Sequence, residues 1–305
     1  MEQDIKWKKF LSNKARYADI INGIIYNGSQ LINADSIHDN NSLPSSKSRD
    51  TIRKTAFGVN FAIIGVENQE TIDYSMPLRS MIYDAAEYDK QALRIRKEVR
   101  QQHENLNDGE YLYGFKRNSR LYPVVTFILY AGTMDWDGAE SLHEILDFTD
   151  IPEQIKEKVQ DYKINLIEIR KLQNMEVFKT DVRQIFDFIK HSENKEALVK
   201  LVESDSYYQN MEQDAFDVAA HYTNADELIS IRKYHKKGGK INMCTAIKEL
   251  IADGRAEGRA EGKIEGINGA ITICRNLNLS DDIISQKIQE TYNLSEEEAC
   301  KFLLT

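Results

Sequence analysis

Short apolar stretches separated by a long amphipathic stretch limit the folds open to this chain. Residues 55–66 are rich in β-branched and aromatic residues with glycines between them, which predicts paired strands that end near Val66. Residues 124–130 and 164–169 are two further buried-strand patterns. Before them, residues 77–103 carry apolar side chains at helical spacing and begin with a proline, which suits the first turn of a helix. Helices that separate strands are typical of an α/β domain with a mixed sheet.

Helical periodicity frames this α/β pattern on both sides. An amphipathic helix is expected at residues 14–26, and beyond residue 172 only helical spacing is seen as far as residue 250. The basic segment at residues 236–240 favours a solvated turn over an anion site. Near the end, Ser295 and Glu298 have the spacing of a capping box. We therefore expect three parts, namely an α/β domain at residues 1–172, a helical region at 173–250, and a repeat helix with a helical hairpin at 251–305.

A repeat with a period of four, Gly-Arg-Ala-Glu and its variants, occupies residues 254–266. On a helix this period places the glycines, the cations and the carboxylates in separate stripes. Like charges four residues apart repel, and each glycine costs roughly 1 kcal/mol relative to alanine, so such a helix would be marginal alone. A partner helix could match the cation stripe with a carboxylate stripe, which predicts a homo-oligomer or a docking helix. A flexible charged spacer explains the repeat equally well.

The charge of the chain is unevenly distributed. The whole chain has 40 Lys and Arg against 49 Asp and Glu, a net charge of −9. Residues 1–130 hold 18 basic against 16 acidic residues, or +2, whereas residues 131–305 hold 22 against 33, or −11. The first part can therefore contact a polyanion locally, while the total charge argues against broad coating by DNA.

The N-terminus, the lengths of the apolar runs and the spacing of the cysteines indicate the cellular compartment. The N-terminus has no apolar core of a secretory signal, and no apolar run reaches the roughly 18 residues of a membrane span. Cys244, Cys274 and Cys300 lie far apart without a CxxC pair, so neither a disulfide framework nor a zinc knuckle is expected. These features predict a cytoplasmic protein with no membrane partner.

Two carboxylates and an amide near one strand end form the best candidate for a chemical site. Glu67 directly follows the apolar strand, and Gln69 shares its face if the strand continues. Asp50 can supply a second carboxylate. Oxygen ligands of this kind suit Mg²⁺ or Mn²⁺, which activates water and stabilises the transition state of phosphodiester cleavage. A strand end with solvated polar residues gives the same pattern by chance.

Longer motifs accompany this pattern. They are the helix Lys14-Ala-Arg-Tyr-Ala-Asp-Ile-Ile-Asn-Gly, the stretch from Arg49 to Asp84, the segment Leu121-Tyr-Pro-Val-Val-Thr-Phe-Ile-Leu-Tyr-Ala-Gly with Trp136-Asp-Gly and Ser141-Leu-His, and Asp161-Tyr-Lys-Ile-Asn-Leu-Ile. Together these motifs resemble the Rpn family of recombination-promoting nucleases, also described as transposases of the PD-(D/E)XK nuclease superfamily. The resemblance covers roughly residues 13–172 and is looser over the rest of the chain.

This resemblance implies a restriction-endonuclease-like core, a mixed sheet flanked by helices, with Mg²⁺-dependent DNA cleavage linked to recombination or mobile elements. Asp50 and Glu67 match the metal-binding and catalytic acids of the motif, and Asp19 resembles an acidic residue of the first helix that joins the metal site. Gln69 stands where most of the superfamily has lysine; it can orient water but cannot act as a base or carry positive charge. The chain is therefore expected to be an endonuclease, or alternatively a catalytically inactive DNA-binding or protein-interaction module of the same fold.

Basic residues near this site are the expected DNA contacts. Such contacts neutralise phosphates, so binding should depend strongly on salt and little on sequence. Tyr83 and Tyr88, on the long helix, are expected in the core rather than stacked on bases. The expected contacts are Arg49, Arg53, Lys54, Arg94 and Lys97, with further cations at Arg96, Arg100, Lys116, Arg117 and Arg120.

Overall fold

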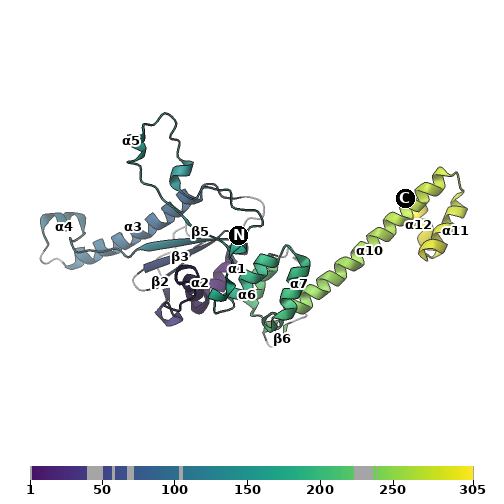
Figure 1. The fold of residues 1–305 in the computed structure, drawn as a ribbon, viewed down its shortest axis with the longest axis horizontal. Helices are drawn as coiled ribbons and strands as arrows, with labels where there is room; N and C mark the ends of the chain where they lie inside the picture. The colour runs from purple at the N-terminus through teal and green to yellow at the C-terminus, as the bar shows by residue number, and fades with distance from the viewer. Residues whose placement is uncertain are drawn as a thin grey trace. The chain divides into compact units, whose positions relative to one another are not determined.

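The fold was determined as a computed structural model, which describes residues 2–39, 51–56, 59–66, 72–102, 106–222, 236–237 and 239–304. The chain divides into two compact units, Met1–Met243 and Cys244–Thr305. The first unit is built around a five-stranded sheet with helices, and the second is helical where described (Figure 1). The predicted α/β class is therefore confirmed.

Helices lie before, between and after the strands in the chain. The strands are β1 (His38–Asp39), β2 (Thr51–Ala56), β3 (Val59–Val66), β4 (Val124–Tyr130), β5 (Asn165–Glu168), β6 (Lys236–Lys237) and β7 (Lys240–Ile241). The helices of the first unit are α1 (Glu2–Ser12), α2 (Lys14–Tyr26), α3 (Met76–Gln102), α4 (Asp108–Tyr113), α5 (Glu153–Lys156), α6 (Val182–His191), α7 (Lys195–Ser204) and α8 (Gln213–His221). Short 3₁₀ turns are η1 (Ala34–Ser36), η2 (Leu142–Ile145), η3 (Ile169–Lys171), η4 (Met175–Val177) and η5 (Ser206–Gln209). The remaining helices are α10 (Met243–Asn276), α11 (Asp281–Tyr292) and α12 (Glu296–Leu304).

The sheet has the order β1-β2-β3-β4-β5. Strands β1, β2 and β3 pair antiparallel, whereas β3, β4 and β5 pair parallel. Parallel neighbours need a crossover connection, and α3 is the long helix in the connection from β3 to β4. The strands expected to end at Val66 and to occupy residues 124–130 are found with those bounds, and the expected long helix is α3.

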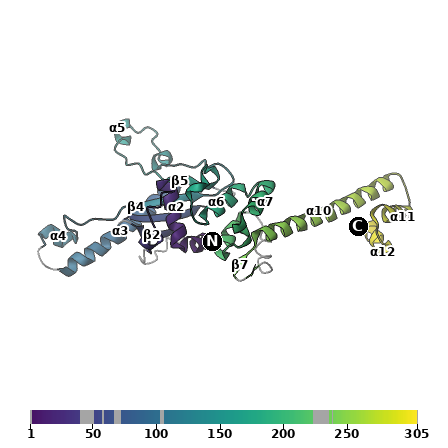
Figure 2. The same ribbon diagram turned by 60° about the horizontal axis from the view of Figure 1, so that its bottom comes forward.

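The central strand β4 is buried on both faces. Thr126, Ile128 and Tyr130 alternate with Phe127 and Leu129 along the strand, and all five side chains are buried. Helix α3 packs on β4, and its far end continues beyond the sheet together with α4 in both views (Figures 1 and 2). The apolar face of α3 therefore packs on the sheet only along the first turns of the helix.

The helices that follow residue 172 pack against the N-terminal helices. Helix α1 packs on α8, and α6 packs on η3, α7 and α8. Trp7 of α1 places its ring against Phe10 and Phe186, and its Nε1 donates a hydrogen bond of 2.9 Å to the Tyr222 hydroxyl. The boundary predicted at residue 172 thus lies within one compact unit. In the basic segment, β6 and β7 pair antiparallel, and Gly239 has a φ of 87°.

The second unit has its own small core. Ile267 and Ile271 of α10 pack with Ile284 and Ile288 of α11 and with Ala299 of α12. The predicted capping box is confirmed, because Ser295 N donates to a Glu298 carboxylate oxygen at 2.8 Å and Glu298 N donates to the Ser295 hydroxyl at 3.2 Å. Of the helices within the described ranges, none has the length and apolar character that crossing a bilayer requires.

The period-four repeat lies on the exposed middle of α10. Gly254, Gly258 and Gly262 have no described atom within 4 Å of the position a Cβ would take. The glycine stripe predicted from the period is therefore open along one side of a helix. A partner for this stripe stays a prediction.

Candidate functional site

The pairing register brings several strand ends to one edge of the sheet. Thr51, the first residue of β2, pairs with Ile64 of β3, while Val66 pairs with Tyr130 and Tyr130 with Glu168. We call this row, formed by Thr51, Val66, Tyr130 and Glu168, the carboxyl edge. In α/β sheets, ligands commonly bind beyond the carboxyl ends of the parallel strands, so this edge is the natural position for a site.

The predicted catalytic residues are attached to this edge along the chain. Asp50, Glu67, Gln69 and Arg49 lie outside the described residues. Their neighbours Thr51 and Val66 belong to the carboxyl edge. The structure describes Arg53 and Lys54 through their backbone, which pairs with Ala62 and Phe61 of β3 in the middle of the strands.

Described polar side chains gather at the end of β5. Lys171 Nζ lies 2.8 Å from Glu168 Oε2 and 3.0 Å from Asp135 Oδ1. Hydrogen bonds to Glu168 and Asp135 raise the pKa of Lys171 above its ordinary value. Trp136 N also donates to Glu168 Oε2, at 3.3 Å. The cation thus bridges two carboxylates beside the edge. No three metal-binding side chains converge anywhere in the described parts of the chain.

Tyr130 connects the sheet to the loop that follows it. Its hydroxyl donates to the Met134 carbonyl at 2.9 Å, and its ring meets Trp136 edge-on with centroids 5.2 Å apart. Burial and the nearby charges of Glu168 and Asp137 raise the pKa of Tyr130. The hydroxyl is therefore held neutral as a hydrogen-bond donor. The sequence pattern indicates a turn here but not this polar group, because its members come from two strand ends.

A buried polar row on α3 fixes the helix against the sheet. Ser80, Asp84, Glu87 and Gln91 follow at spacings of four, three and four, and all are buried. The Asp84 carboxylate accepts hydrogen bonds from the hydroxyls of Thr126 and Tyr162. The Gln91 amide exchanges two hydrogen bonds with the backbone of Tyr122. These bonds set the position of α3 relative to β4, and with it the direction in which the basic end of α3 extends.

Of the two α3 tyrosines expected in the core, Tyr83 is buried and Tyr88 is half-buried. The Tyr83 hydroxyl accepts a hydrogen bond of 2.9 Å from Arg79 Nε. The Tyr88 hydroxyl accepts a hydrogen bond of 3.0 Å from Val124 N at the start of β4. The Tyr83 ring is therefore not available for stacking on a base.

Asp19 is buried and fully engaged within the protein. It lies on α2 with 1% of its surface exposed. Its two oxygens accept hydrogen bonds from Lys179 N at 2.8 Å, and Oδ2 also accepts from Thr180 N and Thr180 Oγ1 at 2.7 Å. The carboxylate therefore holds the backbone that leads into α6. The metal role that the resemblance implies for Asp19 stays a prediction.

Replacement of Asp19 by alanine is expected to lower the free energy of unfolding by about 2–3 kcal/mol, because buried backbone donors would lose a charged acceptor. Urea denaturation followed by tryptophan fluorescence measures this loss, since Trp7 is buried in the same unit. Asp35→Ala is the matched control, because Asp35 is exposed. Unchanged stability together with a loss of Mg²⁺ affinity would instead assign Asp19 to a metal site.

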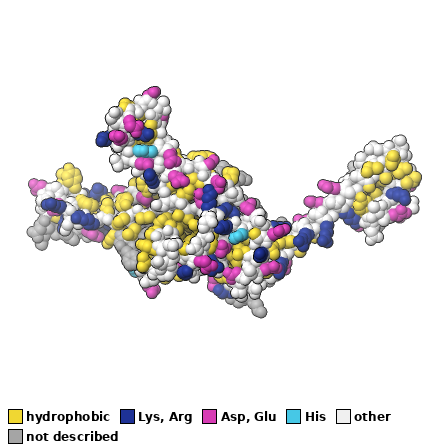
Figure 3. Space-filling view, in the orientation of Figure 1, with side chains coloured by type: hydrophobic (Ala, Val, Ile, Leu, Met, Phe, Trp, Pro, Cys, Tyr) yellow, Lys and Arg dark blue, Asp and Glu magenta, His cyan; other side chains and the backbone are white. Residues whose placement is uncertain are grey.

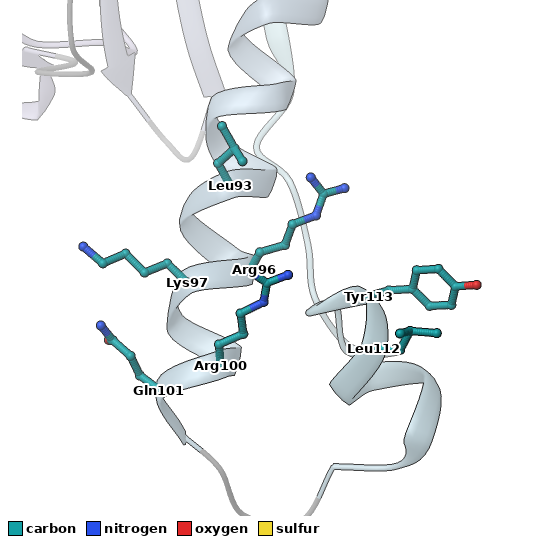
Figure 4. Close-up of a pocket in the computed structure, with 7 residues that line it drawn as sticks. All are labelled: Leu93, Arg96, Lys97, Arg100, Gln101, Leu112 and Tyr113. Atoms are coloured by element: carbon teal, nitrogen blue, oxygen red, sulfur yellow. The ribbon is translucent and has the colours of Figure 1, made fainter.

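Exposed cations line the far end of α3. Arg94, Arg96, Lys97 and Arg100 are all exposed. They lie beyond the amino end of β4 rather than near the carboxyl edge as expected, because α3 runs back along the sheet from the end of β3 to the start of β4. A pocket of about 570 Å³ lies between this end of α3 and α4 (Figure 4). Its walls combine three cations with apolar and aromatic groups. It is lined by Leu93, Arg96, Lys97, Arg100 and Gln101 of α3 and by Leu112 and Tyr113 of α4.

No protein-family model, curated protein or solved structure matches this chain.

Proposed function

We propose that the chain is a metal-dependent DNA endonuclease of restriction-endonuclease-like fold, linked to DNA recombination or mobile-element activity. The observation that carries the proposal is the pairing register of the described strands. Thr51 pairs with Ile64, and Val66 is the last residue of β3. Asp50 directly precedes Thr51 and Glu67 directly follows Val66 in the chain. The two acids are therefore attached to strand ends that meet at one edge of the sheet.

The chemistry of these side chains fits a hard divalent cation. Two carboxylates, completed by water and phosphate oxygens, are the ligand set that Mg²⁺ commonly takes in proteins. When bound, Mg²⁺ or Mn²⁺ would lower the pKa of a coordinated water and offset the charge that develops on the phosphate. Asp50 and Glu67 would hold the ion. Gln69 would donate its amide hydrogen bond to a phosphate oxygen or orient the attacking water, and it takes no proton.

The charge distribution supports a local DNA contact. The basic end of α3 carries Arg94 and Lys97 in the same unit as the carboxyl edge, but beyond the amino end of β4, where Gln91 contacts Tyr122. Arg49, Arg53 and Lys54 flank Asp50 in the chain. A few phosphate contacts of this kind give binding that weakens as salt is raised.

A second candidate function is a catalytically inactive module that binds DNA or protein partners. Gln69 favours this alternative, because an amide supplies neither the charge nor the base that lysine provides in most of the superfamily. The open glycine stripe of α10 also favours it, because the stripe leaves room for a partner helix. The two candidates differ in metal binding and in cleavage.

Cleavage of supercoiled plasmid by the full chain tests the proposal. Nicked and linear products are expected with Mg²⁺ or Mn²⁺ and not with EDTA, and the Asp50→Ala variant is expected to leave the plasmid intact. Calorimetric titration of the wild-type chain with Mg²⁺ in the presence of DNA should give a binding heat. Equal nicking by wild type and Asp50→Ala would show a contaminating nuclease, and absence of both cleavage and heat would favour the inactive module.

A further inference from the structure

The far end of α3 and the segment after it form a projecting basic arm. We define the α3–α4 arm as the described residues 93–102 and 106–122. Both views show it extending beyond the sheet (Figures 1 and 2). These described residues include seven Lys and Arg against three Asp and Glu, or +4, in a chain whose total is −9. It is therefore a local positive feature on an acidic protein.

Aromatic and apolar side chains are exposed on the same arm. Tyr111, Leu112 and Tyr113 of α4 are 68%, 66% and 70% exposed, and Tyr122 is 58% exposed. Figure 3 shows such apolar side chains together with Lys and Arg over this part of the molecule. A row of large side chains left in water, interspersed with cations, indicates a binding surface rather than a core face.

The cations of the pocket are not neutralised by described neighbours. No ion pair joins Arg96, Lys97 or Arg100 to a carboxylate in the described parts of the chain, and the pocket lining contains no acid (Figure 4). The nearby Glu110 carboxylate accepts hydrogen bonds from Asn107 N at 3.3 Å and Arg117 N at 3.1 Å. That acid is thus used to cap α4, and the arginines keep their charge for an anion.

The packing of α4 on α3 is defined by a glycine. Gly114 ends α4 in the left-handed region at a φ of 63°, and a Cβ at this position would lie 3.2–3.3 Å from atoms of Arg96. The close approach sets α4 beside the arginines. The pocket thus has cations on α3 and Leu112 and Tyr113 on α4.

We infer that the α3–α4 arm binds single-stranded DNA. Duplex DNA presents phosphates outside and keeps its bases stacked, so it offers little to exposed tyrosine and leucine side chains. A single strand presents both phosphates and free base faces, and proteins hold it with a basic groove and aromatic platforms. The volume of the pocket, about 570 Å³, is in the range of pockets that take a small ligand such as one nucleotide. This inference rests on the proposed function because it names the form of DNA that the protein holds. The arm lies beyond the amino end of β4, where Tyr88 contacts Val124 and Gln91 contacts Tyr122, so it would hold the strand away from the carboxyl edge.

Fluorescence anisotropy of the full chain with a labelled 20-nucleotide strand, and with the duplex of the same sequence, tests the inference. Measurement in EDTA separates binding from cleavage, so a failure of the nuclease proposal does not alter the result. We expect the single strand to bind at least about tenfold more tightly than the duplex at equal salt. Combined Tyr111→Ala and Tyr113→Ala substitutions should weaken single-strand binding about 5- to 100-fold.

Two control variants distinguish stacking from general effects. Combined Tyr111→Phe and Tyr113→Phe substitutions keep the rings and should retain wild-type affinity. Arg255→Ala with Arg259→Ala removes two exposed cations from the repeat helix and should leave binding unchanged, whereas Arg96→Ala with Arg100→Ala should weaken it and reduce its salt dependence. Duplex binding as tight as single-strand binding, or unchanged single-strand binding by the tyrosine-to-alanine variant, would overturn the inference.

Discussion

Replacement of Glu67 by glutamine is expected to lower the initial rate of Mg²⁺-dependent plasmid nicking by at least about 100-fold, or ~2.7 kcal/mol. Glutamine keeps the shape of the side chain but removes the charge that would hold the cation. Loss of one of two carboxylates would weaken the metal and the stabilisation it gives to the phosphate in the transition state. Single-turnover nicking at several Mg²⁺ concentrations measures the effect. If a higher Mg²⁺ concentration partly restores the nicking rate of the variant, weaker metal binding is the cause of the defect.

Glu70→Gln is the matched control for this measurement. Glu70 lies three residues further along the chain and has no assigned role, so this variant should nick at the wild-type rate. If Glu67→Gln also nicked at the wild-type rate, Glu67 would not be a ligand. The nuclease proposal would then lose the residue on which it depends most.

Replacement of Arg16 by alanine is expected to lower the free energy of unfolding by about 3–5 kcal/mol, because it would leave two partly buried carboxylates without their cation. Arg16 is 4% exposed. Its Nε and Nη2 donate to the two oxygens of Asp181 at 2.7 Å, and its Nη1 donates to Asp214 at 2.7 Å. Burial lowers the pKa of Arg16, but hydrogen bonds to Asp181 and Asp214 outweigh it and raise the pKa above its ordinary value. Urea denaturation followed by tryptophan fluorescence checks the loss.

Arg183→Ala is the matched control for the buried arginine. Arg183 forms an ion pair of 2.8 Å with Glu176, but both side chains are exposed to solvent. Exposed pairs contribute about 0–1 kcal/mol, so this variant should remain close to wild type. Equal stability of the two variants would show that the Arg16 network contributes little to joining α2 to α6 and α8.

The pattern of residue types within short stretches of the sequence was enough to predict several helices and strands and their ends. The strand at residues 124–130, the helix at residues 14–26 and the end of β3 at Val66 agree with the structure. The capping box of Ser295 and Glu298 also agrees. Each of these features depends on residues close together in the chain, whose spacing decides which face is apolar or which backbone donor is capped.

Contacts between segments far apart in the chain could not be predicted from local spacing. Asp19 could be considered as an exposed helix acid or as a metal ligand, yet its partners in the structure are Lys179 and Thr180, 160 and 161 residues away. Likewise, nothing in the spacing around Arg16 indicates Asp181 or Asp214. The short helix α4 was also not indicated, because a helix of six residues carries few periods.

The sequence by itself determined the chemical inventory and the mixed α/β class: the apolar strands, the acids Asp50 and Glu67 beside them, and the cations of α3. Only the tertiary structure decided which of these groups could act together. It pairs the start of β2 with the end of β3, and it packs α4 beside Arg96 and Arg100. The physical reason is that spacing along the chain sets the direction of each side chain within its own element. Which elements become neighbours is decided by the burial and hydrogen bonding of the whole unit.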